Sequence, residues 1–171
     1  MTNALRPFLD RWRLCAVLIA AAMLATAHAF ETFGGYAPCT LCLRQREIYW
    51  AILVGALASM VMVRMPGGPR WREATCWVLG LAFLVSCGVA VYHAGAEWKF
   101  WPGPLACAAG DTTVTAADMA AFLGGEKVRP PSCDQAPWVF AGLSMAGWNA
   151  LISLVFAGLS TLAALRERTK R

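Results

Sequence analysis

The sequence predicts an all-α membrane protein, a four-transmembrane-helix bundle with a long extracytoplasmic loop that carries a short surface helix. Three observations support this class. First, 58% of the 171 residues are hydrophobic and 15% are charged, which leaves more apolar surface than a soluble domain of this length can bury. Second, the apolar residues fall in four long stretches, each about as long as a bilayer-crossing helix needs. Third, the basic residues lie in short clusters beside those stretches.

The four predicted spans cover about residues 14–31, 47–64, 74–95 and 143–165, within a single integral membrane domain, 1–171. A helix rises 1.5 Å per residue, so about 20 residues cross the hydrocarbon core. In lipid the backbone must satisfy its own hydrogen bonds, which favours helices over open strands. The loops that join the first span to the second and the third to the fourth, about residues 32–46 and 96–142, lie on the same, outer side of the membrane.

The distribution of basic residues predicts the orientation. Ten of the fifteen fall at the N-terminus, in the turn between the second and third spans, and at the C-terminus: Arg6, Arg11, Arg13, Arg64, Arg70, Arg72, Arg166, Arg168, Lys170 and Arg171. Cytoplasmic segments carry such an excess, so we expect both termini inside. Basic clusters beside apolar runs fit a lipid bilayer and argue against a nucleic-acid partner.

Two further segments suggest local features, a possible cleavage site and a short helix in the long outer loop. Ala25 to Phe30 reads "ATAHAF", which would also fit the cleavage site of a signal peptide; an uncleaved first span is favoured because three spans make a poorer bundle. In the long outer loop, Thr115 to Leu123 reads as a short helix with Thr115 as its N-cap. It would lie along the membrane surface or pack on its own loop.

The seven cysteines divide by position. Cys15, Cys76 and Cys87 lie within predicted spans, where a thiol behaves as a small hydrophobic side chain. The other four fall on the outer side: Cys39, Cys42, Cys107 and Cys133. Their simplest pairing is Cys39 with Cys42 and Cys107 with Cys133. Closing the longer loop would stabilise the fold by about 3.5 kcal/mol, whereas the Cys39–Cys42 ring constrains almost nothing, so a structural role for that ring is weak.

The sequence "PCTLCLRQR", Pro38 to Arg46, favours redox chemistry at the short pair. Cys42 lies near a helix N-terminus, where the dipole stabilises a thiolate. Arg46, one helical turn further, adds a permanent positive charge on the same face. The uncharged run that follows gives the pair access to a lipid-soluble electron acceptor.

Other interpretations of these residues are weaker. A zinc site normally uses two Cys-x-x-Cys knuckles, and Cys107 and Cys133 stand in separate segments; we expect no metal. A thioredoxin-like motif needs a βαβ context that this chain lacks. Arg46 could also have no redox role, its long side chain only placing its charge at the polar membrane interface.

Four spans, the "PCTLCLRQR" motif, "WPGPLAC" (Trp101 to Cys107) and "SCD" (Ser132 to Asp134) together make the chain similar to the DsbB thiol:quinone oxidoreductases. The resemblance implies a multi-pass protein of the bacterial inner membrane with its active cysteines in the periplasm. It implies that a periplasmic DsbA-like protein of thioredoxin fold attacks Cys107, and that the freed Cys133 attacks Cys39. Cys42 would then be left as a thiolate beside a quinone, ubiquinone or menaquinone, from the membrane pool.

By the same resemblance Arg46 would stabilise the thiolate and the reduced quinone, and His93 is a second candidate cofactor-binding residue. His93, Glu97 and nearby aromatic residues would either line the quinone site or simply end the third span. Two other functions stay open at this stage: a disulfide-stapled, non-enzymatic membrane scaffold, and a dedicated DsbB relative that serves one specific substrate.

Overall fold

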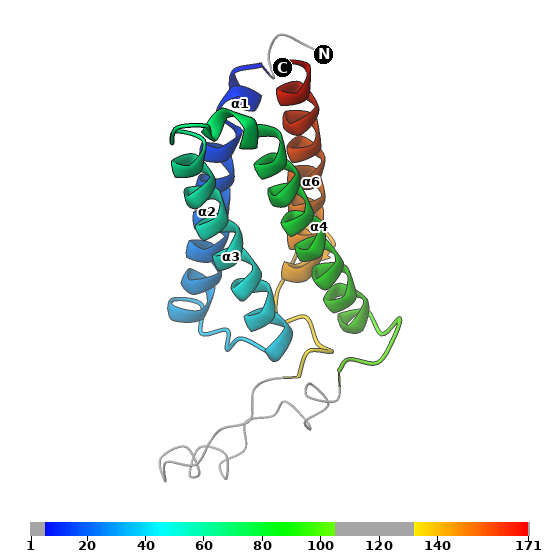
Figure 1. The fold of residues 1–171 in the computed structure, drawn as a ribbon. Helices are drawn as coiled ribbons and strands as arrows, with labels where there is room; N and C mark the ends of the chain where they lie inside the picture. The colour runs from blue at the N-terminus through cyan, green and yellow to red at the C-terminus, as the bar shows by residue number, and fades with distance from the viewer. Residues whose placement is uncertain (1–5, 105–131, 171) are drawn as a thin grey trace, which may run out of the picture.

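Four long helices form most of the structure (Figure 1). The computed structural model describes residues 6–104 and 132–170. Along the chain the elements are α1 (Arg6–Asp10), α2 (Trp12–Thr32), α3 (Thr40–Met62), the 3-10 helix η2 (Gly68–Trp71), α4 (Arg72–Glu97), β1 (Val139–Phe140), β2 (Leu143–Ser144) and α6 (Met145–Thr169).

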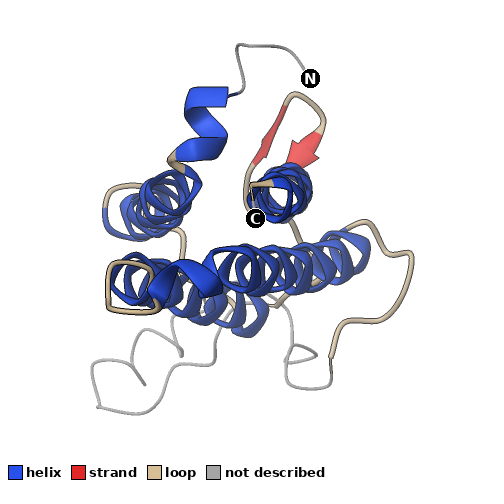
Figure 2. Cartoon of the chain, turned by 45° about the horizontal axis from the view of Figure 1, so that its top comes forward, coloured by secondary structure: helices blue, strands red, loops and turns tan. Residues whose placement is uncertain are grey.

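Helix α4 packs most extensively on α6, and α3 lies between α2 and α4 (Figures 1 and 2). Small residues permit the close α4–α6 approach. A Cβ atom placed on Gly80 would lie 3.0 Å from the Cβ of Ser160, and Ala157 and Ala164 continue the same buried face of α6. Small side chains at helix interfaces are typical of membrane bundles, because apolar lipid gives little hydrophobic drive for helix association.

Away from the α4–α6 contact, large aromatic rings fill the interior of the bundle. The ring of Trp12 stacks on that of Phe156 with centroids 5.7 Å apart, and Phe83 lies 5.6 Å from Phe156. Tyr49 meets Phe83 edge-on at 6.5 Å. Such pairs stabilise helix contacts beyond their area alone, and here they join all four long helices.

Among the described residues, α2, α4 with η2, and α6 are long and apolar enough to cross a membrane. The predicted all-α membrane class is therefore confirmed. The uncharged part of α3 is only the fifteen residues from Ile48 to Met62, because Arg44, Arg46 and Glu47 occupy its first turns. At 1.5 Å per residue this covers about 22 Å, less than the core of a typical bilayer. The second predicted span, residues 47–64, therefore stays a prediction.

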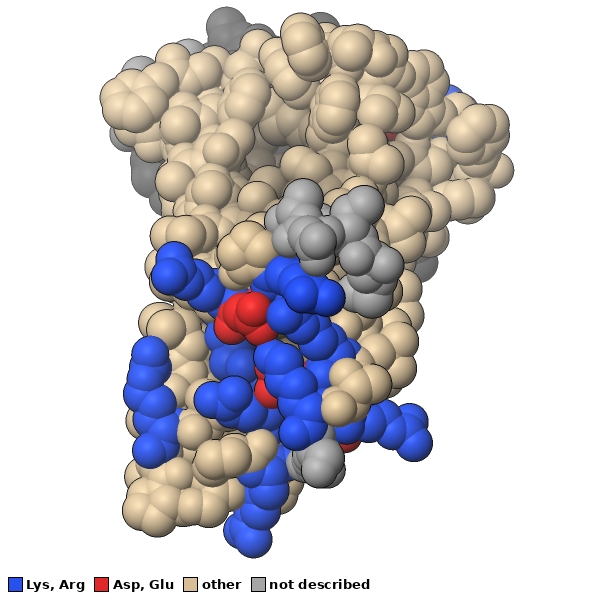
Figure 3. Space-filling view, turned by 90° about the horizontal axis from the view of Figure 1, so that it is seen from above, with Lys and Arg blue, Asp and Glu red and all other residues tan. Residues whose placement is uncertain are grey.

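Charged residues gather at the end of the bundle that holds both termini and η2 (Figures 1 and 3). The Arg13 guanidinium donates to Thr75 Oγ1 and, at 2.6 Å, to the Arg72 carbonyl. Arg166 and Lys170 both pair with Asp10, at 3.0 and 2.8 Å. The start of α3, with its cysteines, lies at the opposite end.

The chain enters α6 through a short antiparallel hairpin, in which Val139 pairs with Ser144 and Phe140 with Leu143. Ala141 and Gly142 turn the chain with φ of 49° and 80°, as a two-residue hairpin requires. Helix α6 begins at Met145, because Ser144 caps it by accepting a hydrogen bond from the Gly147 amide. The expected helix at Thr115 to Leu123 lies outside the described residues.

Candidate redox site

Cys39 and Cys42 open helix α3. Cys39 is its N-cap, with an extended backbone, and its sulfur accepts a hydrogen bond from the Cys42 amide at 3.2 Å. The two Sγ atoms lie 2.7 Å apart and both residues are free thiols. The expected Cys39–Cys42 disulfide is thus not formed in this structure, which holds the reduced state of the pair; a redox pair occupies both states in turn.

The two thiols of the pair differ in acidity. The Cys39 side chain donates a hydrogen bond to the Cys42 sulfur, which lowers the pKa of Cys42, and the Arg46 charge acts in the same direction against the effect of burial. The same hydrogen bond and burial raise the pKa of Cys39. Cys42 therefore carries the negative charge when the pair loses one proton, as the helix N-terminus also favours.

Arg46 joins α3 to α2. Its Nη1 donates to Glu31 Oε2 and its Nη2 donates to the Ala27 carbonyl at 3.0 Å. The Arg46 side chain is 14% exposed, so its charge lies mostly inside the protein. Two fixed hydrogen bonds hold the guanidinium in place, which favours a binding role over free extension to the membrane interface.

His93 reaches the pair from α4. Its Nε2 lies 3.5 Å from Cys39 Sγ, and its Nδ1 lies 2.9 Å from Gln45 Nε2. Gln45 Oε1 accepts from Asn149 at 2.6 Å, and Asn149 Oδ1 accepts from the Tyr49 hydroxyl at 2.7 Å. A continuous hydrogen-bonded chain thus runs from the bundle core to the sulfur of Cys39.

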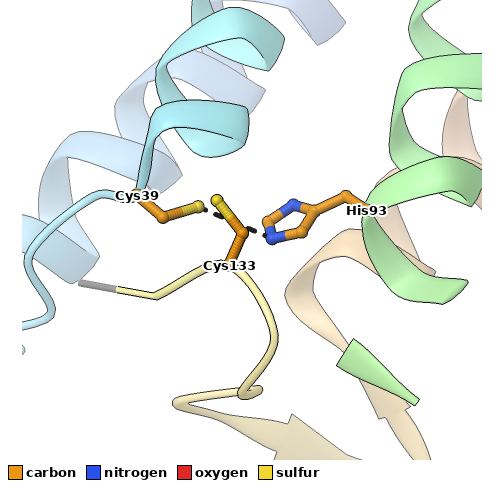
Figure 4. A group of neighbouring side chains, drawn as sticks. All are labelled: Cys39, His93 and Cys133. Atoms are coloured by element: carbon orange, nitrogen blue, oxygen red, sulfur yellow. Dashed lines mark hydrogen bonds between the residues drawn. The ribbon is translucent and has the colours of Figure 1, made fainter. Parts of the chain in front are cut away.

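Cys133 completes a cluster with Cys39 and His93 (Figure 4). Their ligand-type atoms all lie within 4.8 Å of one another, and all three side chains are buried. Such a group could hold a soft metal ion if both sulfurs were thiolates. Cys133 is disulfide-bonded, however, so in this state the cluster places a disulfide sulfur beside a thiol. The expected partner, Cys107, lies outside the described residues.

A cavity of about 370 Å³ opens beside Cys42, between α2, α3, the hairpin and α6. Its lining is mainly apolar and aromatic, and includes Phe30, Tyr36, Trp138, Phe140, Trp148, Cys42, Gln45, Arg46, Tyr49 and Asn149. Cavities of this kind, with a few polar groups, are typical of small-molecule sites. Cys42 and Arg46 line it, whereas Cys39 faces the cluster with Cys133.

The structure brings together Cys39, Cys42, Cys133, Arg46 and His93 as predicted candidates at one end of the bundle. Within the described part of the chain, His93 is not among the cavity-lining residues, so its predicted cofactor role stays a prediction. Sequence reasoning missed Glu31 as the partner of Arg46. Its signal was an acidic residue at the end of an otherwise uncharged span, on the same side of the membrane as Arg46.

The fold and the site define a class: a helical membrane protein that places a Cys-x-x-Cys pair beside a disulfide-bonded cysteine. A family model, "Disulfide bond formation protein DsbB", matches residues 10–163. The chain is 31% identical over 148 residues to disulfide bond formation protein B of Dechloromonas aromatica, covering 84% of this chain and 82% of the relative. It is 30% identical over 165 residues to that of Methylococcus capsulatus, covering 90% of each. The chain belongs to the DsbB family, which confirms the resemblance seen in the sequence.

Proposed function

We propose that this protein is a membrane thiol:quinone oxidoreductase that reoxidises a DsbA-like dithiol protein. One observation carries the proposal: the two sulfurs of the Cys-x-x-Cys pair face different partners. Cys39 lies with the disulfide-bonded Cys133, and Cys42 lines the apolar cavity. A pair placed this way receives electrons at one sulfur and delivers them at the other.

The cysteines act in series in this proposal. The reduced partner attacks Cys107 and releases Cys133 as a thiolate. Cys133 attacks Cys39 in the oxidised pair, the Cys39–Cys42 bond breaks, and the electron pair stays on Cys42. Each step is attack of a thiolate on a disulfide sulfur, so it is favoured by a leaving thiol of low pKa. The positive charge of Arg46 acts to lower the pKa of Cys42 and stays in place after Cys39 has bonded to Cys133, which makes Cys42 the better leaving group of its pair.

The cavity fits a quinone headgroup. Its walls are aromatic and apolar, and its few polar groups include the Arg46 guanidinium. A quinone supplies a two-electron acceptor there. Cys42 would contact it, Arg46 would bind the oxygen on which negative charge accumulates, and Trp138, Phe140 and Trp148 would pack against the ring.

The proposed location is the bacterial inner membrane, with both termini cytoplasmic and the cysteines periplasmic. The opposite placement of the basic end and the cysteine end supports it. A DsbA-like partner of thioredoxin fold would then meet the cysteine end from the periplasm, while quinone would come from the membrane pool.

The test is quinone reduction by the purified full-length protein after addition of a reduced DsbA-like dithiol. The wild-type protein should reduce quinone, and the Cys42→Ser variant should be inactive. The rate of quinone reduction by Arg46→Ala should be at least about tenfold lower, the loss expected when one hydrogen bond to a charged group is removed. Arg44→Ala is the matched control, because Arg44 is exposed and, within the described part of the chain, pairs with Glu47 one helical turn away at 2.8 Å. Wild-type protein that leaves quinone untouched would favour a stapled membrane scaffold instead.

A further inference from the structure

The hydrogen-bonded chain behind His93 fixes which ring nitrogen carries its proton. Tyr49 donates to Asn149 Oδ1, and the Asn149 amide donates to Gln45 Oε1. The Gln45 amide nitrogen is therefore the atom that meets His93 Nδ1, at 2.9 Å, and it donates there. In a neutral imidazole whose Nδ1 accepts, the proton is on Nε2.

The Nε2–H group points at sulfur. Cys39 Sγ lies 3.5 Å away, an ordinary distance for a hydrogen bond to sulfur. Glu97 Oε1 also lies near Nε2, but at 3.7 Å it is beyond hydrogen-bond range for oxygen, and the other oxygen of Glu97 accepts from Ser144. The His93 ring is thus held as a donor to Cys39.

We propose that His93 is a catalytic hydrogen-bond donor that stabilises negative charge on Cys39 Sγ during exchange with Cys133, and that Gln45 and Asn149 are positioning residues that hold it in the donor tautomer. The role rests on the proposed function, in which Cys39 and Cys133 are transiently bonded. When a thiolate attacks Cys133 in that bond, a new bond forms to Cys133, the Cys39–Cys133 bond breaks, and the electron pair stays on Cys39. The N–H group of His93 then faces the new thiolate.

Negative charge on Cys39 Sγ is poorly stabilised without such a donor. It is 5% exposed and its sulfur lies 2.7 Å from that of Cys42, so a charge there gains little from water and is opposed by any charge on Cys42. A donor fixed in advance offsets this without reorganisation during the reaction, as donors do at other sites where negative charge develops. The position of His93 outside the cavity lining agrees with a role toward Cys39.

The test follows cleavage of the Cys39–Cys133 disulfide alone. In full-length Cys42→Ser/Cys107→Ser protein, Cys39 and Cys133 are oxidised to a single disulfide, which is then cleaved by glutathione. Glutathione attacks either sulfur, and peptide mass spectrometry shows which cysteine carries the adduct. With His93 present, cleavage should leave glutathione mainly on Cys133, because Cys39 is the stabilised leaving group.

His93→Leu should slow cleavage at least about tenfold and move the adduct toward Cys39, since a hydrogen bond to a charged group is lost. His93→Gln should retain much of both properties, because its amide places an N–H near the position of Nε2. Gln45→Leu, which leaves His93 in place but frees its tautomer, should shift the adduct in the same direction. His28→Leu, at the other and exposed histidine, should change neither.

Equal rates and equal adduct ratios in wild-type and His93→Leu backgrounds would overturn the proposal. So would a His93→Gln protein as impaired as His93→Leu, because ring packing would then explain both. The assay contains neither quinone nor a protein partner. Failure of the proposed function would therefore appear only in the quinone assay and failure of this inference only here.

Discussion

Removing the Cys39 side chain should make Cys42 a weaker acid. Cys39 Sγ donates the hydrogen bond that does most to lower the pKa of Cys42, across 2.7 Å. A hydrogen bond to a charged group contributes about 1.5–3 kcal/mol, and one pKa unit corresponds to about 1.4 kcal/mol. Cys39→Ala should therefore raise the pKa of Cys42 by about 1–2 units. Cys39→Ser, which keeps a donor and a helix N-cap, should raise it by less.

The assay is the pH dependence of Cys42 alkylation in reduced, quinone-free protein, with the modified cysteine identified by peptide mass. The thiolate reacts, so the pH at half-maximal rate reports the pKa. Because the Cys39 thiol lowers this pKa, wild-type Cys42 should react at a lower pH than Cys42 in the Cys39→Ala variant. Equal midpoints in the alanine and serine variants would refute the assignment of the hydrogen bond as the main cause.

The remaining predictions concern the bundle. Gly80→Val should destabilise the protein by about 1–3 kcal/mol, the usual effect of overpacking, because its Cβ would meet Ser160 at 3.0 Å. Gly88→Val, where nothing lies within 4 Å, is the control, and equal unfolding midpoints in detergent would count against close packing of α4 on α6 at Gly80. Tyr49→Phe should cost about 0.5–1.5 kcal/mol, the net contribution of one hydrogen bond, because Asn149 Oδ1 loses the Tyr49 donor but keeps the one from Ser153 at 3.2 Å. An unchanged denaturation midpoint would contradict a stabilising role for the Tyr49 hydroxyl.

The features that could be predicted from the sequence are those set by local patterns, namely long apolar stretches and the spacing of residues a few positions apart. Apolar stretches placed α2, α4 and α6, and the spacing of Cys39, Cys42 and Arg46 placed a sulfur pair with a cation one turn away. Helix α3 begins at Thr40, before its predicted span, because Cys39 caps it; hydropathy detects only the uncharged part that follows.

The long-range partners could not be predicted in the same way. Gln45, Asn149 and Tyr49 form one chain only because α3 and α6 pack side by side, and each alone reads as an isolated polar residue in an apolar helix. His93 was ambiguous for the same reason: the sequence placed it near the end of a helix, but its neighbours come from other helices. The Glu31–Arg46 pair likewise depends on how α2 meets α3.

The most direct test of the electron route is to trap the bond between the two cysteine pairs. Wild-type protein in its oxidised form would be mixed with a reduced DsbA-like dithiol, quenched with acid at short times, and digested without reduction. The proximity of the Cys39 and Cys133 sulfurs predicts a transient Cys39–Cys133 disulfide in the wild type. The same disulfide should accumulate in Cys107→Ser, where the free Cys133 can still attack the oxidised Cys39–Cys42 pair and Cys107 is not there to displace Cys39. If Cys39 is never found linked to Cys133 while the dithiol is oxidised, the proposed route is wrong.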